Sequence, residues 1–156
     1  MVTQDSAHNL LAAYSQHAGV PGLKFSPDGC ARLLFEDAVA VDLEVDPSGD
    51  RIQIYSVLGP VPAGGREQLY RRLLEGNLFG SQTAGASLSI DPVQDEVLLC
   101  KPYGLDAEDA AHLAKVLEEF AGAAAHWRKA LGAGELTAGA GDTAAGGDWQ
   151  GSFLRG

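Results

Sequence analysis

The stretch from Leu69 to Lys101 limits the possible folds most tightly, because no linker-like composition interrupts it. Apolar residues recur at helical spacing over 67–79, and glycines near its end stop that pattern. Apolar residues then alternate with serines over 87–91, before a turn that contains proline and a second apolar run over 97–101. The stretch therefore predicts a helix followed by a β-hairpin.

Two segments of this stretch, Leu73–Phe79 and Thr83–Asp91, resemble the central signature of the Tir-chaperone family. The members of that family are class I chaperones of type III secretion. The resemblance implies a small acidic homodimer that holds the unfolded N-terminal segment of a cognate effector, keeps it soluble and secretion-competent, and uses no ATP.

The residues before this stretch predict one helix and three strands. A single apolar stripe over Gln4 to Ala18 favours a helix, which Gly19 is well placed to end. Strand-like runs follow over 30–36, 38–45 and 51–58, separated by turn-forming residues. The second run alternates apolar with acidic residues, so we expect one face of the sheet to meet water and the strands to be antiparallel.

A last helix is predicted from Asp106 to Leu131, with acidic residues at its start and basic residues near its end. The sequence thus predicts one α+β domain over residues 1–131, with three helices and a five-stranded antiparallel sheet in the order α-β-β-β-α-β-β-α. This order matches the Tir-chaperone family, and the resemblance covers roughly residues 7–131. Residues 132–156 are rich in glycine and alanine and are expected to be a disordered tail, with a candidate docking motif at Trp149, Phe153 and Leu154.

Composition and charge exclude several classes of partner. With 46% hydrophobic and 21% charged residues, the chain is typical of a soluble domain, and no apolar run approaches the roughly 20 residues that cross a bilayer. The first residues lack the pattern of a signal peptide, so we expect a cytoplasmic protein, in a bacterium if the resemblance holds. A net charge of -10 repels phosphate backbones and anionic lipids, which argues against nucleic acid and membranes as partners.

No residue pattern predicts catalysis, a cofactor or a metal. The segment Gly132–Gly134 looks like the start of a dinucleotide fingerprint, but it follows a helix and lacks the third glycine. Cys30 and Cys100 have no CxxC spacing and are interpreted as buried small apolar residues. No metal-ligand motif includes any of the four histidines, which are His8, His17, His112 and His126.

Three functions are compatible with these observations. The leading hypothesis is a type III secretion chaperone that forms a homodimer and binds a secreted effector through its N-terminal, chaperone-binding segment. The alternative is a non-enzymatic cytoplasmic regulator or scaffold of the same fold that binds a folded partner. An enzyme with an unrecognised site is the third, and no residue pattern supports it.

The resemblance also implies two sets of site residues. The first helix and first strand would bind the effector, through Leu10, Leu11, Tyr14, Phe25, Leu33 and Phe35. The central helix and second hairpin would form the dimer interface, through Leu73, Leu74, Leu78, Phe79, Leu88 and Leu98. For both sets the alternative is that the side chains fill the core of the monomer, since a domain of this size needs a helix stripe and a sheet face to close.

Overall fold

The computed structural model describes residues 4–106 and 109–139 and confirms the predicted α+β fold and order of elements. Three helices and five strands alternate along the chain, joined in two places by a 3-10 turn. In chain order they are α1 (Gln4–Ala18), β1 (Cys30–Phe35), η1 (Glu36–Ala38), β2 (Val39–Val45), β3 (Arg51–Pro60), α2 (Arg66–Gly76), η2 (Leu78–Gly80), β4 (Ser87–Asp91), β5 (Glu96–Gly104) and α3 (Ala110–Gly132).

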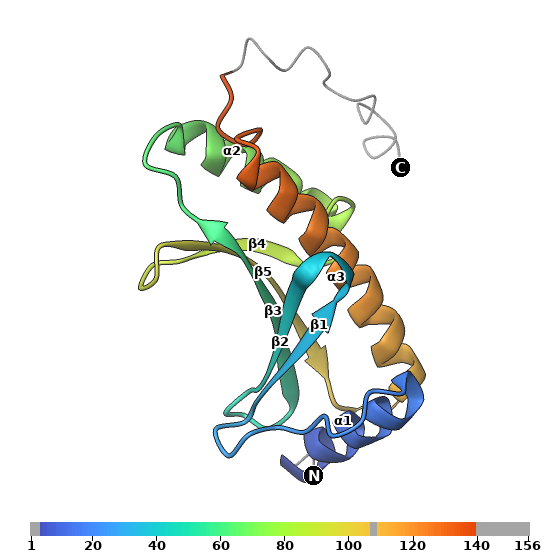
Figure 1. The fold of residues 1–156 in the computed structure, drawn as a ribbon. Helices are drawn as coiled ribbons and strands as arrows, with labels where there is room; N and C mark the ends of the chain where they lie inside the picture. The colour runs from blue at the N-terminus through green and yellow to red at the C-terminus, as the bar shows by residue number, and fades with distance from the viewer. Residues whose placement is uncertain (1–3, 107–108, 140–156) are drawn as a thin grey trace, which may run out of the picture.

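The five strands form one antiparallel sheet in the order β1-β2-β3-β5-β4, so β1 and β4 lie at its edges (Figure 1). The strands β1, β2 and β3 form a meander, and the hairpin β4–β5 joins it through β3. At the two edges of the sheet, Leu33 of β1 lies opposite Val41 of β2, and Leu88 of β4 lies opposite Leu99 of β5. A bulge between Val57 and Gly59 interrupts the pairing of β3 with β5.

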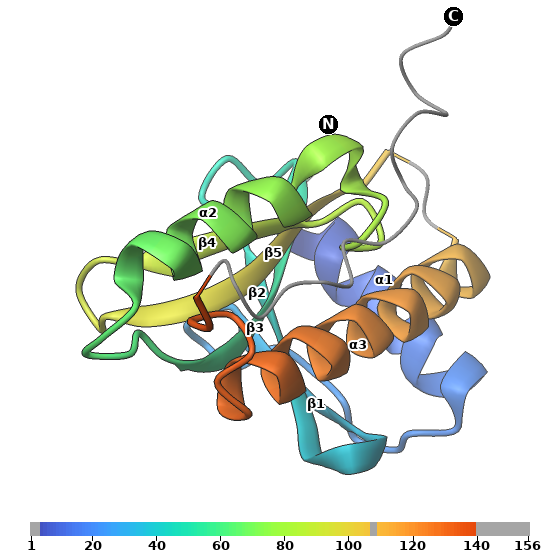
Figure 2. The same ribbon diagram turned by 90° about the horizontal axis from the view of Figure 1, so that it is seen from above.

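The long helix α3 covers one face of the sheet and builds the core (Figures 1 and 2). Its apolar stripe, which includes Leu117 and Phe120, is fully buried against Leu43, Ile54 and Leu99 of the sheet. The helix begins after Asp109, whose Oδ1 accepts hydrogen bonds from the backbone N–H groups of the first turn. The helices α1 and α2 flank α3 near its two ends, α1 in contact with α3 and α2 in contact with β4.

The central helix ends at Gly76, the first of the two glycines, Gly76 and Gly80, that are expected to mark its end. The apolar spacing runs on to Phe79, but α2 stops at Gly76 and the chain turns through Asn77 into η2. Phe79 there has a φ of 58°, a left-handed conformation that costs a residue with a side chain roughly 1–2 kcal/mol. The turn therefore directs Leu78 and Phe79 away from the line of the helix.

The tail predicted over residues 132–156 begins with a described turn. Leu136 is buried, and the N–H of Glu135 donates to the carbonyl of Ala130. Thr137 lies against Gly65 at the start of α2, where a Cβ on the glycine would come within 2.7 Å of the Cβ of Thr137. Residues 140–156, including the candidate docking motif, lie outside the described residues.

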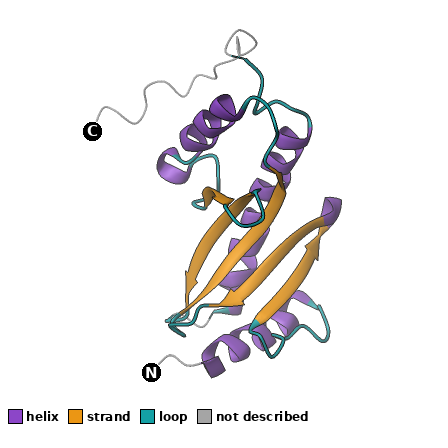
Figure 3. Ribbon diagram, turned by 90° about the vertical axis from the view of Figure 1, so that its left-hand side faces the viewer, coloured by secondary structure: helices purple, strands orange, loops and turns teal. Residues whose placement is uncertain are grey.

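Among residues 4–106 and 109–139, no helix covers most of the second face of the sheet (Figure 3). Side chains along β3 alternate between the two faces of the sheet. Ile52, Ile54 and Leu58 point to α3 and are buried, while Val57 points to the other face and is exposed. The fold therefore leaves a sheet face and the edge of β1 available to a partner.

Candidate binding surfaces

The outer edge of β1 presents backbone groups that no strand of the sheet pairs. At its start, the N–H of Cys30 donates to the Oγ of Ser26 at 3.2 Å, and the carbonyl of Cys30 accepts from the N–H of Ser26 at 2.8 Å. These bonds show that the backbone of Cys30 faces away from β2. Because backbone directions alternate along a strand, Arg32 and Leu34 also turn their N–H and C=O groups outward. An added strand could pair with this edge.

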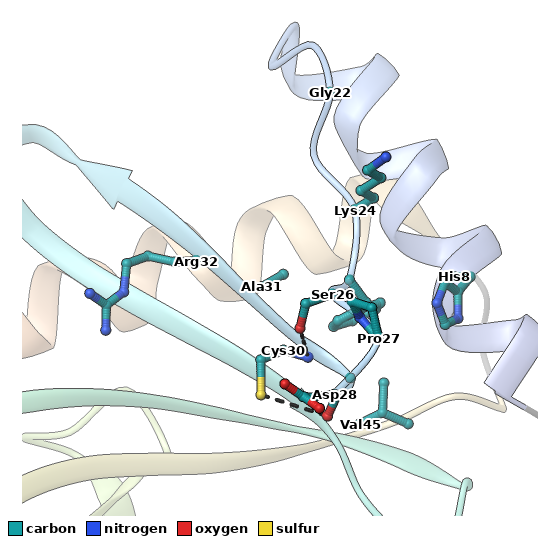
Figure 4. Close-up of a pocket in the computed structure, with 12 residues that line it drawn as sticks. His8, Gly22, Lys24, Ser26, Pro27, Asp28, Cys30, Ala31, Arg32 and Val45 are labelled. Atoms are coloured by element: carbon teal, nitrogen blue, oxygen red, sulfur yellow. Dashed lines mark hydrogen bonds between the residues drawn. The ribbon is translucent and has the colours of Figure 1, made fainter.

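A pocket of about 820 Å³ adjoins the start of this edge (Figure 4). We call it the sheet-edge pocket; it lies between α1, the loop 22–29 and the first residues of β1. Phe25 lines it and is buried, with its ring edge-on to His8 at a centroid distance of 5.4 Å. The pocket mixes charged and apolar residues, so it suits a peptide side chain better than a purely apolar ligand.

Cys30 lines the same pocket and is exposed, which corrects its interpretation as a buried residue. Partial desolvation raises the pKa of the Cys30 thiol, and the negative charges of Glu44 and Asp28 raise it further. A raised pKa keeps the thiol protonated at neutral pH, and a protonated thiol is a poor nucleophile. Cys100 is half-buried, and both cysteines are free.

A second hollow of about 590 Å³ lies between α1 and α3, and we call it the α1–α3 groove. Tyr14 of α1 and Phe35 of β1 form its walls, and Ala121 and Gly122 of α3 belong to its floor. The lining is largely apolar, with Glu36 among the few charged residues. The groove can accept an apolar side chain from a partner.

The open face of the sheet carries a partly apolar surface beside an ion pair. Leu34 is 77% exposed there, and Val57 pairs with Leu98 across the β3–β5 ladder on the same face. Arg32 binds Asp42 through two hydrogen bonds of 2.7 and 3.0 Å. Neither Leu34 nor Val57 is among the site residues that the sequence analysis predicts.

A separate exposed cluster, the α2 patch, consists of Tyr70, Leu74, Leu78 and Phe79. Leu74 is 73% exposed and Phe79 is 70% exposed. The side chain of Asn77 fixes this region by donating to the carbonyl of Leu88 at 3.2 Å and accepting from its N–H at 2.7 Å. Tyr70 is the member that the sequence analysis did not assign to the interface, although its place one turn before Leu74 could have indicated it.

The six residues predicted to bind an effector are mostly inside the monomer. Five have exposures of 1–6% and belong to the core: Leu10, Leu11, Tyr14, Phe25 and Leu33. Phe35 is half-buried. Phe25 nevertheless lines the sheet-edge pocket, and Tyr14 and Phe35 line the α1–α3 groove. Their role in binding stays a prediction.

The six residues predicted for the dimer interface divide into three groups. Leu74, Leu78 and Phe79 are exposed in the α2 patch. Leu73 and Leu88 are buried in the monomer, and Leu98 is half-buried on the open face of the sheet. Their role in dimerisation also stays a prediction.

Among the described residues, no group of three or more His, Cys, Asp or Glu side chains is arranged to hold a metal ion. No helix in that part of the chain is long and apolar enough to cross a membrane.

Comparison with known proteins identifies a family whose model matches this chain. The model of the Tir chaperone protein (CesT) family matches residues 9–128, which is well over half of the chain. A search of curated protein sequences finds no match.

Several solved structures share the fold. A chain of the HopA1-SchA chaperone-effector complex has a TM-score of 0.68 at 19% identity, covering 81% of this chain and 95% of that one. A chain of the ExsC-ExsE complex has a TM-score of 0.68 at 21% identity, covering 83% and 96%. A chain of the ExoT-SpcS complex from Pseudomonas aeruginosa has a TM-score of 0.61 at 19% identity, covering 78% and 96%.

Proposed function

The chain belongs to the Tir chaperone protein (CesT) family, and from this premise we propose that it is a type III secretion chaperone for a cognate effector. It binds the unfolded N-terminal segment of the effector and keeps the effector soluble and secretion-competent. The observation that carries this function is the open edge of β1, which lies between the sheet-edge pocket and the α1–α3 groove. Chaperone-effector complexes among proteins of the same fold support it.

The binding mechanism begins with backbone pairing. An extended effector segment adds to β1 as a sixth strand and pairs with the outward N–H and C=O groups of Arg32 and Leu34. Alternate side chains of the segment then lie over the open sheet face, against Leu34, or enter the neighbouring pockets. Backbone pairing tolerates many sequences, so the pockets supply the selectivity.

The predicted effector-binding residues act as pocket walls in this proposal. Phe25 shapes the sheet-edge pocket, and Tyr14 with Phe35 shapes the α1–α3 groove. Leu10, Leu11 and Leu33 support these walls from the core. An effector that orders on binding has to bury a large area to offset its lost conformational entropy, so several pockets in series suit it.

The chain acts as a homodimer joined through the α2 patch. An apolar cluster rimmed by charged residues such as Arg71 and Glu75 is typical of a protein interface. A homodimer therefore offers two β1 edges to one effector.

The protein works by binding alone, in the bacterial cytoplasm where effectors are made, without catalysis, nucleic acid or membrane.

The decisive experiment identifies the bound segment. The tagged chain is isolated from its native bacterium, the co-purifying protein is identified by mass spectrometry, and its N-terminal segment is produced separately for calorimetric titration. We expect the isolated segment to account for the binding of the whole partner and to be protected from proteolysis only in the complex. Binding through a folded domain of the partner would instead establish the regulator or scaffold.

A further inference from the structure

One flank of α3 carries a run of three hollows that share lining residues. A hollow of about 360 Å³ at the end of the helix shares Arg128 with a neighbour of about 550 Å³, and that neighbour shares Ala125 with the α1–α3 groove. The run extends along the helix from Gly132 to Ala114, a length of about 27 Å at 1.5 Å per residue. We call it the α3 flank groove, and an extended segment of about eight residues would span it.

The two ends of this groove differ in chemistry. Near the end of the helix it is basic, with His126, Arg128 and Lys129 around it. Among the described residues, neither Arg128 nor Lys129 is within 4.0 Å of a carboxylate, and Arg128 donates to the neutral carbonyl of Ala38 at 2.8 Å. Farther along, apolar residues such as Phe35 and Ala121 make up most of the lining, and Glu36 and Glu118 are acidic. A fitting occupant has acidic residues near apolar ones.

Gly122 lies in the apolar half of this groove. A Cβ at Gly122 would meet nothing within 4 Å, so packing of the described chain does not demand glycine there. A glycine inside a helix costs roughly 1 kcal/mol relative to alanine. An occupant that approaches the helix backbone closely would account for this cost.

The chain itself contains a segment of the required chemistry. Asp148 precedes Trp149, Phe153 and Leu154, and Asp142 lies six residues farther upstream. The described chain stops at Gly139, two residues after Thr137, which contacts Gly65 at the start of α2. From there residues 140–148 reach at most about 30 Å, and as a flexible glycine-rich linker they would span about 17 Å on average. The groove begins at Gly132, seven residues before Gly139, so a linker of this length allows residue 148 to return to the basic end of the groove.

We propose that residues 148–155 of the same chain dock in the α3 flank groove, with Asp148 near Arg128 and Lys129 and the apolar residues against Ala121, Gly122 and Ala125. The α2 patch is a poorer receptor, because Arg71 there already pairs with Glu75 at 2.8 Å and Arg66 with Asp95 at 3.6 Å. Tethering gives the segment a high effective concentration, so a weak contact suffices.

The docked segment would occupy the groove that Tyr14 and Phe35 line. The docking does not rest on the proposed chaperone function, and it is testable without an effector.

The test compares backbone amide NMR spectra of the full-length protein and of the double variant Trp149→Ser/Phe153→Ser. We expect shifts of the amides of Ala121, Gly122 and Ala125, and a synthetic peptide of residues 140–156 added to the double variant should restore the original positions. The control Val93→Ser, in the exposed turn between β4 and β5, should leave these amides unchanged.

A receptor variant makes the test independent of the tail. Added to the double variant, the substitution Gly122→Gln fills the groove from open space without a clash, so the protein should fold while the peptide of residues 140–156 no longer binds. Unchanged groove amides in the double variant, shifts at Tyr70 and Leu74 instead, or shifts that disappear on dilution would each overturn the proposal, the last because it indicates a second copy as receptor.

Discussion

At the scale of single residues, two glycines in helices have opposite reasons to be there. Gly76 is buried, and a Cβ at this position would come within 2.6 Å of the Trp127 ring and 3.0 Å of Leu88. Gly122 is exposed, with open space at the same position. The first glycine is required by packing between α2 and α3, and the second is not.

This contrast predicts opposite effects for the same substitution. We expect Gly76→Ala to lower the free energy of unfolding by roughly 1–3 kcal/mol, because a rigid indole and a strand residue have to move. Gly122→Ala should raise it by up to about 1 kcal/mol, because alanine is the better helix former. Urea unfolding of the two variants measures both values, and equal effects of the same sign would show that the packing of Gly76 is not tight.

At the scale of elements, the β2–β3 turn is organised by Asp46. Its carboxylate accepts hydrogen bonds from the Nε2 of Gln53 at 3.0 Å and from the hydroxyl and N–H of Ser48. The bond from Gln53, followed by those from Ser48, lowers the pKa of Asp46 to about 2. A group whose pKa is lower in the folded state stabilises the fold above its unfolded pKa and loses that contribution as the pH falls through its folded pKa.

We therefore expect the turn to lose stability between about pH 4 and pH 2 as Asp46 takes up a proton. The variant Asp46→Asn should be less dependent on pH in this range than the original protein. Thermal unfolding at a series of pH values measures the difference. The same substitution type at an exposed site of α3, Glu119→Gln, is the control, and an unchanged pH profile in Asp46→Asn would contradict the assignment.

The edge of β1 is the element that the proposed function depends on most. Leu34→Pro removes an outward N–H without removing a bond inside the sheet, and proline is tolerated at such edge positions. We expect this variant to keep its fold, by circular dichroism, and to lose calorimetric binding of the effector segment. Leu34→Ala keeps the N–H and should bind more tightly than Leu34→Pro; equal affinities would show that the backbone of this edge is not used.

The sequence predicts an element well where the interactions that form it are local in the chain, and poorly where they join distant residues. Alternation in β2 and the stripe in α3 predict the buried apolar residues, because the periods of strand and helix are local properties. Alternation fails for Asp42, which is expected to meet water but is buried beside Arg32. The break at Asn77 could not be predicted from spacing, since Leu78 continues the helical pattern and the bonds from Asn77 to Leu88 join distant parts of the chain. The solvent exposure of single leucines in α2 could not be predicted from the sequence either. Leu73 and Leu74 are neighbours in sequence, yet only Leu74 faces away from α3 and β4.

At the scale of the whole molecule, two apolar surfaces lie in different places and can serve different partners. The α2 patch is formed by α2 and η2, whereas the β1 edge lies at the end of the sheet opposite β4. Figure 2 shows α2 and the β1–β2 hairpin on opposite sides of α3. A dimer formed through the α2 patch therefore leaves the β1 edge of each copy free for an effector.

Phe79 provides the sharpest test of whether the α2 patch is the dimer interface, because its backbone strain and its exposure both oppose the stability of a monomer. The variant Phe79→Gly relieves the left-handed conformation, which by itself stabilises the isolated domain. Loss of an exposed aromatic anchor should at the same time weaken the dimer, and the further change Leu74→Ser should weaken it more. Sedimentation velocity at micromolar concentration is then expected to show a shift toward the 16.2 kDa monomer. Val93 is even more exposed but lies in the β4–β5 turn, so Val93→Ser should leave the dimer intact. A dimer that survives both changes in the α2 patch would place the interface elsewhere.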